Sequence, residues 1–306
     1  MQLYDIVILT DRRYINAKET NTYIKNLLLE DRLVFKALEQ QGLKVARKAW
    51  DDPCFDWNIT KCALFRTTWD YFDRYVEFSH WLKSVSSKTQ LINSKELLHW
   101  NIDKHYLQDL ANKGVNIPKT LFIEKGQKHT LHKTVDEAIE TLDFTCNDYI
   151  LKPCVSGAAR HTYKMHKSEI SQHEAIFQKL ISSEALMLQE FQKNIVAHGE
   201  VSMMIFEGIF THAVLKVAKA GDFRVQDDFG GSVHTYDATK DEIAFAKKVV
   251  AACPELPLYA RVDIFRDNMN KLALAELEIF EPELWFRYFP KAATILAQSI
   301  KRTYFS

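Results

Sequence analysis

Three carboxylates and one guanidinium are predicted to converge on a hairpin near the end of the chain. Alternate side chains of a strand share a face, so Arg261 and Asp263 point to one side of the first strand, and Glu276 and Glu278 share a face of the second. Close carboxylates repel one another, so a cation is expected to neutralise them. Oxygen ligands on rigid strands suit magnesium. The alternative is a solvated edge hairpin in which Arg261 forms a cross-strand salt bridge.

The register of this hairpin determines which side chains face each other. A turn centred at 268–269 places Arg261 opposite Glu276 and Asp263 diagonal to Glu276. We therefore expect the carboxylates and the guanidinium to lie within reach of one another.

A second group of residues could hold a polyphosphate. Lys152 ends an apolar strand and is followed by a loop of small residues that includes Ser156 and Gly157. A point charge beside backbone N–H groups that can approach closely suits phosphate oxygens. Lys104 is a second candidate for the same role. The alternative for each lysine is an ordinary solvated side chain.

A strand that ends in Gln189, Glu190 and Phe191 could present its backbone edge to an adenine. Glu200 follows Gly199 and could accept hydrogen bonds from ribose hydroxyls. The alternative is an ordinary strand and turn.

Further along, Lys216 precedes Arg224, and a double glycine, Gly230 and Gly231, follows. An arginine near such a turn could grip a phosphate or a carboxylate, or it could be a plain surface arginine. Five cysteines without any CxxC pairing indicate reduced thiols. Cys154 lies in the small-residue loop, but without a local His or acid partner it is not expected to be a nucleophile.

Three polar residues lie just past predicted strands of the first ninety residues. Arg66 and Asp70 follow one strand, and Asp11 follows the first strand of the chain. The carboxyl ends of parallel strands commonly border a ligand cleft. These three residues are the weakest candidates, and the role expected of them is substrate specificity.

Composition excludes several classes of protein. The 306 residues include 40 basic and 40 acidic side chains, so the net charge is zero, and this argues against a mainly electrostatic nucleic-acid binder. No stretch approaches the ~20 consecutive apolar residues of a membrane span. The first residues do not resemble a signal peptide, so the cytoplasm is the expected location.

The elements that must position these residues follow from apolar periodicity. Strands are predicted at 3–9, 43–46, 63–66, 121–123, 149–152, 186–190, 200–206, 209–216, 259–265 and 272–280. Helices are predicted at 30–41, 69–81, 103–113, 135–142, 168–181, 240–252 and 290–302. The first ninety residues therefore form an α/β unit with a parallel sheet, and the last third is strand-rich, or α+β. Neither the dinucleotide-binding glycine fingerprint nor the P-loop pattern is present.

The order of these motifs resembles the ATP-grasp superfamily, and within it the glutathione-synthetase-like group. The likeness covers 101–306, and the unit before it resembles the preATP-grasp domain of the same proteins. Three segments resemble the branch that contains the cycloserine-pathway O-ureidoserine cyclo-ligase: 66–71, 221–226 and 276–282. The resemblance implies a preATP-grasp α/β domain at 1–97, a central lid subdomain at 98–188, and a C-terminal subdomain with the metal site at 189–306.

The resemblance also implies roles for the candidate residues. Lys104, Lys152, Ser156, Gly157 and Lys216 would bind the nucleotide's phosphates. Gln189, Glu190 and Phe191 would frame the adenine, and Glu200 would bind the ribose. One or two magnesium ions, or manganese, would bind Asp263, Glu276 and Glu278. Arg224 and Arg261, with Gly230 and Gly231, would stabilise an acyl phosphate and a tetrahedral intermediate.

The implied activity is an ATP-dependent ligase that joins a carboxylate to an amine, both small amino-acid-like molecules, and forms an amide, a peptide or a cyclised product. A homodimer is compatible with the likeness; nucleic-acid and membrane partners are not expected. The alternatives are a phosphotransferase with the same fold and a nucleotide-binding regulatory protein without turnover. Many relatives carry Glu-x-Asn where this chain has Glu276 and Glu278, and the extra carboxylate leaves the number of ions open.

Overall fold

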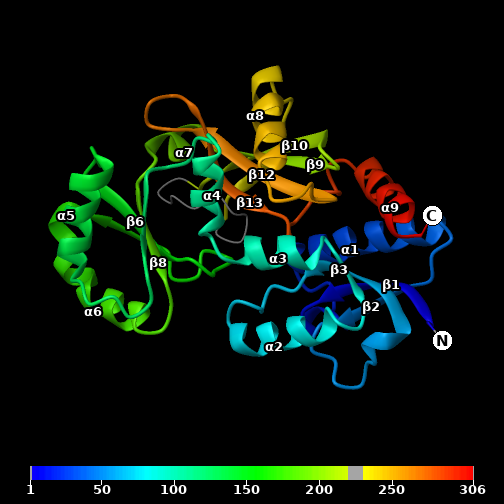
Figure 1. Cartoon of the computed structure of the whole chain (residues 1–306). Coiled ribbons are helices and arrows are strands. Elements are labelled where there is room, and N and C mark those ends of the chain that lie inside the picture. The colour runs from blue at the N-terminus through cyan, green and yellow to red at the C-terminus, as the bar shows by residue number, and fades with distance from the viewer. Residues whose placement is uncertain (1, 220–229, 306) are drawn as a thin grey trace.

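The first sheet consists of four parallel strands in the order β2-β1-β3-β4 (Figure 1). The computed structural model describes residues 2–219 and 230–305. The strands and their covering helices are β1 (Tyr4–Thr10), α1 (Thr22–Gln40), β2 (Val45–Ala49), β3 (Thr60–Thr67), α2 (Tyr75–Val85), β4 (Gln90–Ile92) and α9 (Lys291–Tyr304). Ile6 and Ile8 of β1 share a core with α1 and α9, whereas Val7 and Leu9 share a core with α2. Both faces of the sheet are therefore covered, and the predicted parallel α/β unit is confirmed.

The second sheet along the chain is antiparallel, in the order β5-β8-β6-β7, and α5 and α6 contribute to its core. Its elements, with the two helices that lead into it, are α3 (Lys95–Ile102), α4 (Tyr106–Asn112), β5 (Thr120–Ile123), α5 (Leu131–Leu142), β6 (Asp148–Pro153), β7 (Tyr163–His166), α6 (Ile170–Ile181) and β8 (Leu186–Glu190). The expected boundary between residues 188 and 189 falls inside β8, so Gln189 and Glu190 belong to this sheet.

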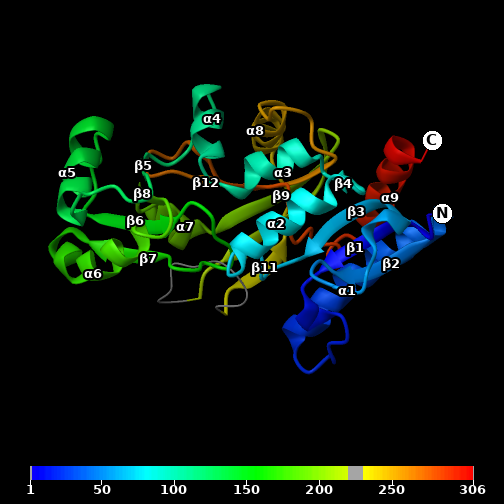
Figure 2. The same cartoon turned by 60° about the horizontal axis from the view of Figure 1, so that its bottom comes forward.

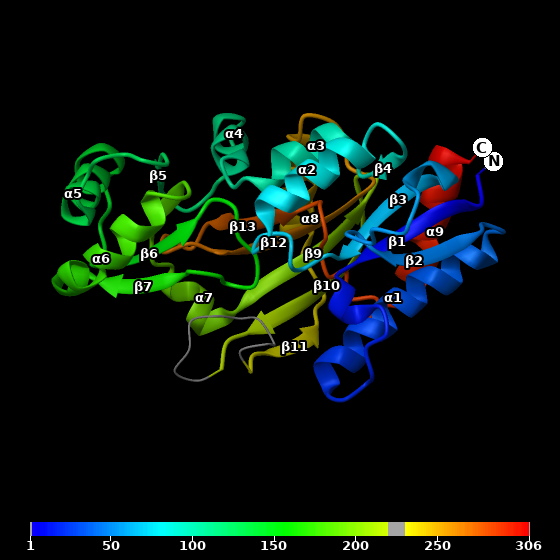
Figure 3. The same cartoon turned by 90° about the horizontal axis from the view of Figure 1, so that it is seen from below.

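The C-terminal sheet is also antiparallel, in the order β11-β10-β9-β12-β13, and α8 shares its core. Its elements are α7 (Lys193–His198), β9 (Glu200–Phe206), β10 (Ile209–Val217), β11 (Ser232–Thr235), α8 (Lys240–Ala251), β12 (Tyr259–Arg266) and β13 (Leu272–Glu278). This sheet lies between the other two in every view (Figures 1, 2 and 3), while α9 returns to lie beside α1. Among the described residues, no helix has the length and apolar character needed to cross a membrane.

The register of the acidic hairpin differs from the prediction by two residues. Arg261 pairs with Glu278, and Asp263 pairs with Glu276. The pair nearest the turn is Arg266 with Leu272. The turn is therefore centred on Met269 and not between residues 268 and 269, which accounts for one of the two residues. The other half of the difference comes from a bulge between Asp263 and Ile264, which shifts the pairing by one more residue.

Two predicted helices have different bounds in the structure. The helix expected at 69–81 begins at Tyr75, because turns occupy the preceding segment, with backbone bonds from Tyr71 to Thr68 and from Asp73 to Asp70. The helix expected at 103–113 is α4, which begins at Tyr106 after a break that follows α3.

Candidate functional site

One cavity of about 530 Å³ lies where the three sheets meet, and most of the predicted site residues line it. These residues come from the loop between α3 and α4, from β6 and the loop after it, and from β8, β9, β10, β12 and β13. They are Lys104, Lys152, Ser156, Gly157, Gln189, Glu190, Phe191, Glu200, Lys216, Arg261, Asp263, Glu276 and Glu278. The fold therefore brings together thirteen residues that are spread over 175 positions of the chain (278 minus 104, plus one).

The three carboxylates of β12 and β13 form a compact group. Asp263, Glu276 and Glu278 each place one oxygen within 4.8 Å of the other two. The side chain of Asp263 is only 2% exposed, and those of Glu276 and Glu278 are 33% and 25% exposed. The hairpin is thus not a solvated face, and its negative charge is enclosed by protein.

Basic side chains contact this group from three directions. Lys104 Nζ lies 3.0 Å from Glu276 Oε1, and Lys216 Nζ lies 2.9 Å from Asp263 Oδ2. The guanidinium of Arg261 donates to both Asp263 and Glu278. These contacts offset repulsion among the acids and hold them at one place.

Burial and neighbouring charges give the three acids different pKa values. Burial alone would raise the pKa of Asp263, but Arg261 and Lys216 outweigh it and hold that pKa well below its ordinary value. Burial is likewise outweighed at Glu276, whose pKa is lowered by nearby lysines. At Glu278 burial prevails, with repulsion from Glu276 and Asp263, and raises the pKa to about 7.

The loop after β6 covers one side of this group. Lys104 Nζ donates to the carbonyl oxygen of Ser156 at 2.7 Å. A Cβ at Gly157 would lie 2.6 Å from Cε1 of Phe72, so this position requires glycine for close packing against the first unit. Ala158 and Ala159 have φ of 48° and 53°, a left-handed conformation that favours glycine. Burial lowers the pKa of Lys152, beside this loop.

The residues predicted to bind adenine and ribose line the same cavity. Gln189 Nε2 donates to Thr120 Oγ1 at 2.9 Å. The carboxylate of Glu190 accepts from the backbone N–H of Cys146 at 3.2 Å, so this side chain is tied to the chain that precedes β6. Glu200 lies 2.5 Å from Lys216 Nζ. β8 is paired with β5 on one side and with β6 on the other, so the expectation that this strand presents a free backbone edge is wrong for Leu186–Gln189.

Five predicted residues that the structure describes do not line the cavity, and a sixth lies outside the described residues. Arg66 is buried and donates to the carbonyl of Pro282 at 2.8 Å. Asp70 accepts from Trp50 Nε1 at 2.7 Å. Asp11 caps the short 3₁₀ helix after β1 and holds the guanidinium of Arg13. The other three are Gly230 and Gly231, which the structure describes, and Arg224, which lies outside the described residues.

Arg66, Asp70 and Asp11 are thus engaged in protein contacts away from the cavity, and a role for them in substrate specificity stays a prediction. The cavity is lined by residues that the sequence reasoning did not assign: Arg13, Tyr14, Tyr23, Trp69, Tyr71, Asp73, Glu281, Glu283 and Trp285. Arg13 and Trp69 follow the carboxyl ends of β1 and β3, a placement that could have drawn attention to them.

Two family models match the chain. The ATP-grasp domain of prokaryotic glutathione synthetase matches residues 119–275. The N-terminal domain of the D-cycloserine synthetase DcsG matches residues 6–93. The first match covers 157 of the 306 residues, which is more than half of the chain (275 minus 119, plus one).

Individual proteins are similar over nearly the whole length. The cycloserine biosynthesis protein DcsG of Streptomyces lavendulae is 28% identical over 289 residues, which are 87% of this chain and 91% of the relative. The crystal structure of D-cycloserine synthetase DcsG superposes with a TM-score of 0.85 at 23% identity, covering 97% of this chain and 98% of the other. D-alanine–D-alanine ligase from Bacillus anthracis, complexed with ATP, gives 0.65 at 14% identity, covering 98% and 97%. The ATP-grasp ligase PsnB, complexed with a minimal precursor, Mg and ADP, gives 0.62 at 16% identity, covering 99% and 98%.

Proposed function

The chain belongs to the family of the prokaryotic glutathione synthetase ATP-grasp domain, and from that premise we propose that it is an ATP- and magnesium-dependent ligase that joins a carboxylate to an amine. In this reaction ATP phosphorylates the carboxylate, the amine attacks the acyl phosphate, and ADP and phosphate leave. The observation that carries the proposal is the enclosed group of three carboxylates, with three lysines and Arg261 in the same cavity.

The donor set fits magnesium. Asp263, Glu276 and Glu278 offer carboxylate oxygens on two paired strands, and the open cavity beside them leaves room for phosphate oxygens. When bound, the ion would offset negative charge on the transferring phosphoryl group. The raised pKa of Glu278 means that ion binding would release a proton from this side chain near neutral pH.

The other cavity residues have separate tasks in this proposal. Lys104 and Lys152 bind phosphates, and Ser156 and Gly157 bring the backbone of the loop over them. Lys216 holds Asp263 in its ionised form and lies beside Glu200.

The remaining roles concern the base and the reacting carboxyl group. Gln189, Glu190 and Phe191 frame the adenine, and Glu200 binds the ribose. Arg261 stabilises negative charge that develops on the acyl group. The resemblance to the ATP-grasp superfamily supports the same role, stabilising charge on the acyl group, for Arg224, Gly230 and Gly231.

The substrate that we propose is small and amino-acid-like. The 28% identical relative is named as a cycloserine biosynthesis protein, which supports an amide, peptide or cyclised product. Arg13 and Glu283 also line the cavity and give it side chains of both charge signs. A zwitterionic substrate matches such a lining.

The test is a screen for substrate-dependent ADP release, with free phosphate and product mass measured together. A ligase releases phosphate and joins two groups, whereas a stable phosphorylated product would identify a phosphotransferase. ATP binding without turnover across a broad set of amino acids and amines would support a regulatory protein.

Two variants then test the site. Glu276→Gln and Lys152→Ala should each abolish turnover, because one removes a metal ligand and the other a phosphate contact. Glu96→Gln and Lys95→Ala on the exposed surface of α3 are matched controls for the same chemical changes. Wild-type ADP release by either cavity variant would show that the site is assigned incorrectly.

A further inference from the structure

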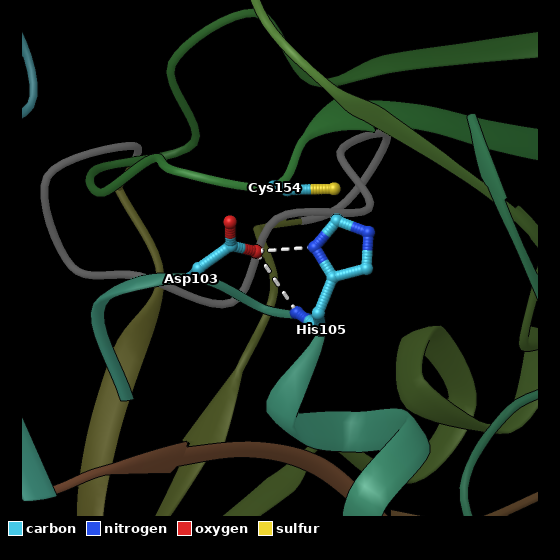
Figure 4. A group of neighbouring side chains, drawn as sticks. All are labelled: Asp103, His105 and Cys154. Atoms are coloured by element: carbon cyan, nitrogen blue, oxygen red, sulfur yellow. Dashed lines mark hydrogen bonds and ion pairs between the residues drawn. The ribbon is translucent and has the colours of Figure 1, made fainter. Parts of the chain in front are cut away.

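A second group of possible metal ligands lies outside the cavity. Asp103, His105 and Cys154 each place one ligand atom within 4.8 Å of the other two, and none of them lines the cavity. Figure 4 shows the Cys154 side chain extending toward the imidazole, and the Asp103 carboxylate bonded to that ring and to the His105 backbone. Two distant segments therefore meet here: the loop before α4 and the end of β6.

The ring of His105 is placed between two carboxylates. Its Nδ1 lies 2.6 Å from Asp103 Oδ1, and its Nε2 lies 3.3 Å from Glu124 Oε1. The ring also stacks on Phe122 with 4.5 Å between centroids, which fixes its orientation.

A neutral imidazole at His105 cannot donate to both carboxylates. A neutral imidazole carries one proton, and if Nδ1–H donates to Asp103, the bare Nε2 faces the carboxylate of Glu124. Consistent with this conflict, Nε2 is buried and makes no hydrogen bond among the described residues. Either a second proton or a metal ion on Nδ1 resolves the conflict, since with metal on Nδ1 the ring proton moves to Nε2 and donates to Glu124.

The thiol of Cys154 supplies a third ligand for a metal ion at this position. Cys154 is 1% exposed, and its position is fixed by backbone bonds to Ala185 and Lys104, both 2.9 Å long. The thiolate of a cysteine is a strong ligand for a zinc-class ion, and Cys154 places its sulfur beside the ligand atoms of Asp103 and His105. Asp103 and His105 are 43% and 35% exposed, so an ion can enter from solvent.

We propose that Asp103, His105 and Cys154 bind one divalent ion of the zinc class, with a water molecule as the fourth ligand. Glu124 accepts the proton of Nε2 and orients the ring, as carboxylates commonly do behind a metal-bound histidine. The thiol proton is released on binding. Ligands of tetrahedral zinc are about 3.5 Å apart, so His105 Nδ1 and Asp103 Oδ1, which lie 2.6 Å apart, separate by roughly an ångström when the ion takes the place of their hydrogen bond.

The location gives this ion a consequence for the neighbouring cavity. Lys104 lies between Asp103 and His105, and Lys152 lies two residues before Cys154. An ion that joins these segments restrains both lysines without contacting either of them. The zinc-class site is nevertheless independent of the proposed ligase activity, because it forms without nucleotide or substrate.

The test uses cobalt as the probe, with the full chain and excess magnesium to occupy the three carboxylates of the cavity. One equivalent of cobalt should produce the near-ultraviolet thiolate-to-cobalt charge-transfer absorption, and zinc should displace the cobalt and remove it. Cys154→Ser should abolish the absorption. His105→Gln, at a partly exposed position, should weaken cobalt binding about tenfold or more.

Matched controls separate this site from adventitious binding. Cys54→Ser removes an exposed thiol and His99→Gln removes an exposed imidazole, and both variants should bind cobalt as the wild type does. The proposal is overturned if cobalt binds without charge-transfer absorption, if no binding is detected, or if Cys54→Ser is the variant that abolishes the absorption. None of these readouts involves ATP turnover, so a negative result would leave the proposed ligase activity standing.

Discussion

At the scale of single residues, Glu278 is the least compensated of the three acids in the cavity. Asp263 contacts both Arg261 and Lys216, whereas Glu278 has to share Arg261. Burial first, and then repulsion from Glu276, raise the pKa of Glu278 to about 7. Glu278 is therefore partly protonated near neutral pH, and this proton reduces the negative charge that a cation would otherwise neutralise.

This proton predicts a dependence of stability on pH. The folded pKa of Glu278 is about 7 and its ordinary value is 4.5, so the protonated side chain contributes stability that is present below pH 4.5 and lost as the pH rises through about 7. Glu278→Gln stays uncharged. In EDTA, the Tm of the variant minus that of the wild type should therefore increase as the pH rises through this window. A difference that is constant with pH would contradict the assignment.

Gly199 offers a second prediction at this scale. Its φ is +82°, and a Cβ there would lie 2.5 Å from the carbonyl oxygen of Lys216. Gly126 has a φ of +80° with no atom within 4 Å, so it is a matched control for the backbone alone. We expect Gly126→Ala to cost about 1 kcal/mol and Gly199→Ala about 3 kcal/mol or more, because β10 must also shift. Urea unfolding of both variants measures the difference, and equal losses would exclude the contact.

At the scale of elements, the long apolar strands were predicted from the sequence, whereas three short strands, β4, β7 and β11, were not. Continuous apolar runs located β8 and β9 at their observed bounds. β4, β7 and β11 have three or four residues each, too few for a periodic pattern. α1 begins at Thr22, eight residues before the predicted start, because Asn21 caps a first turn that has little apolar periodicity. The N-cap residue Asn21 is the sequence signal that could have located the start of α1.

The candidate site could be predicted to the extent that its residues lie on strands. Alternation placed Asp263, Glu276 and Glu278 on one face without any knowledge of the fold. Which residues of the first unit enter the cavity depends on how the units pack, so Arg13 was missed, and Arg66, which was predicted near substrate, is buried away from the cavity. The bulge in β13, where Ala275 is left unpaired, left no mark in the sequence pattern, and it accounts for half of the register error.

The loop after β6 supplies the prediction for this scale. Gly157→Ala would place a Cβ 2.6 Å from the ring of Phe72, so the loop should be displaced from the first unit and from Lys104. The expected result is an increase of severalfold in the KM for ATP, with a smaller change in kcat. Phe72→Ala removes the obstructing ring, and the double variant should recover most of the lost affinity. If Phe72→Ala does not rescue Gly157→Ala, the ring contact is not the cause.

At the scale of the whole molecule, β13, which carries Glu276 and Glu278, is the outermost strand of its sheet. Its free edge is covered by side chains of α3 and α4, the helices that connect the first unit to the second sheet. Asn101 of α3 donates to the carbonyl of Leu277 at 2.8 Å and accepts from the N–H of Ile279 at 2.9 Å. The hydroxyl of Tyr106 in α4 accepts from the N–H of Leu277 at 2.9 Å. These bonds satisfy an edge that would otherwise be open, and they bracket Glu278.

Asn101 should therefore link the stability of the molecule to the proposed magnesium site. Asn101→Ala leaves two backbone groups without partners in a buried position, a loss of about 2–4 kcal/mol. Because those groups flank Glu278, the magnesium concentration for half-maximal ATP turnover should also rise severalfold. Asn58→Ala, at an exposed position, is the control and should change stability by less than about 0.5 kcal/mol. Urea unfolding and a magnesium titration of ADP release measure the two effects. If Asn101→Ala loses stability but keeps its magnesium requirement, the edge bonds hold the units together without positioning the carboxylates.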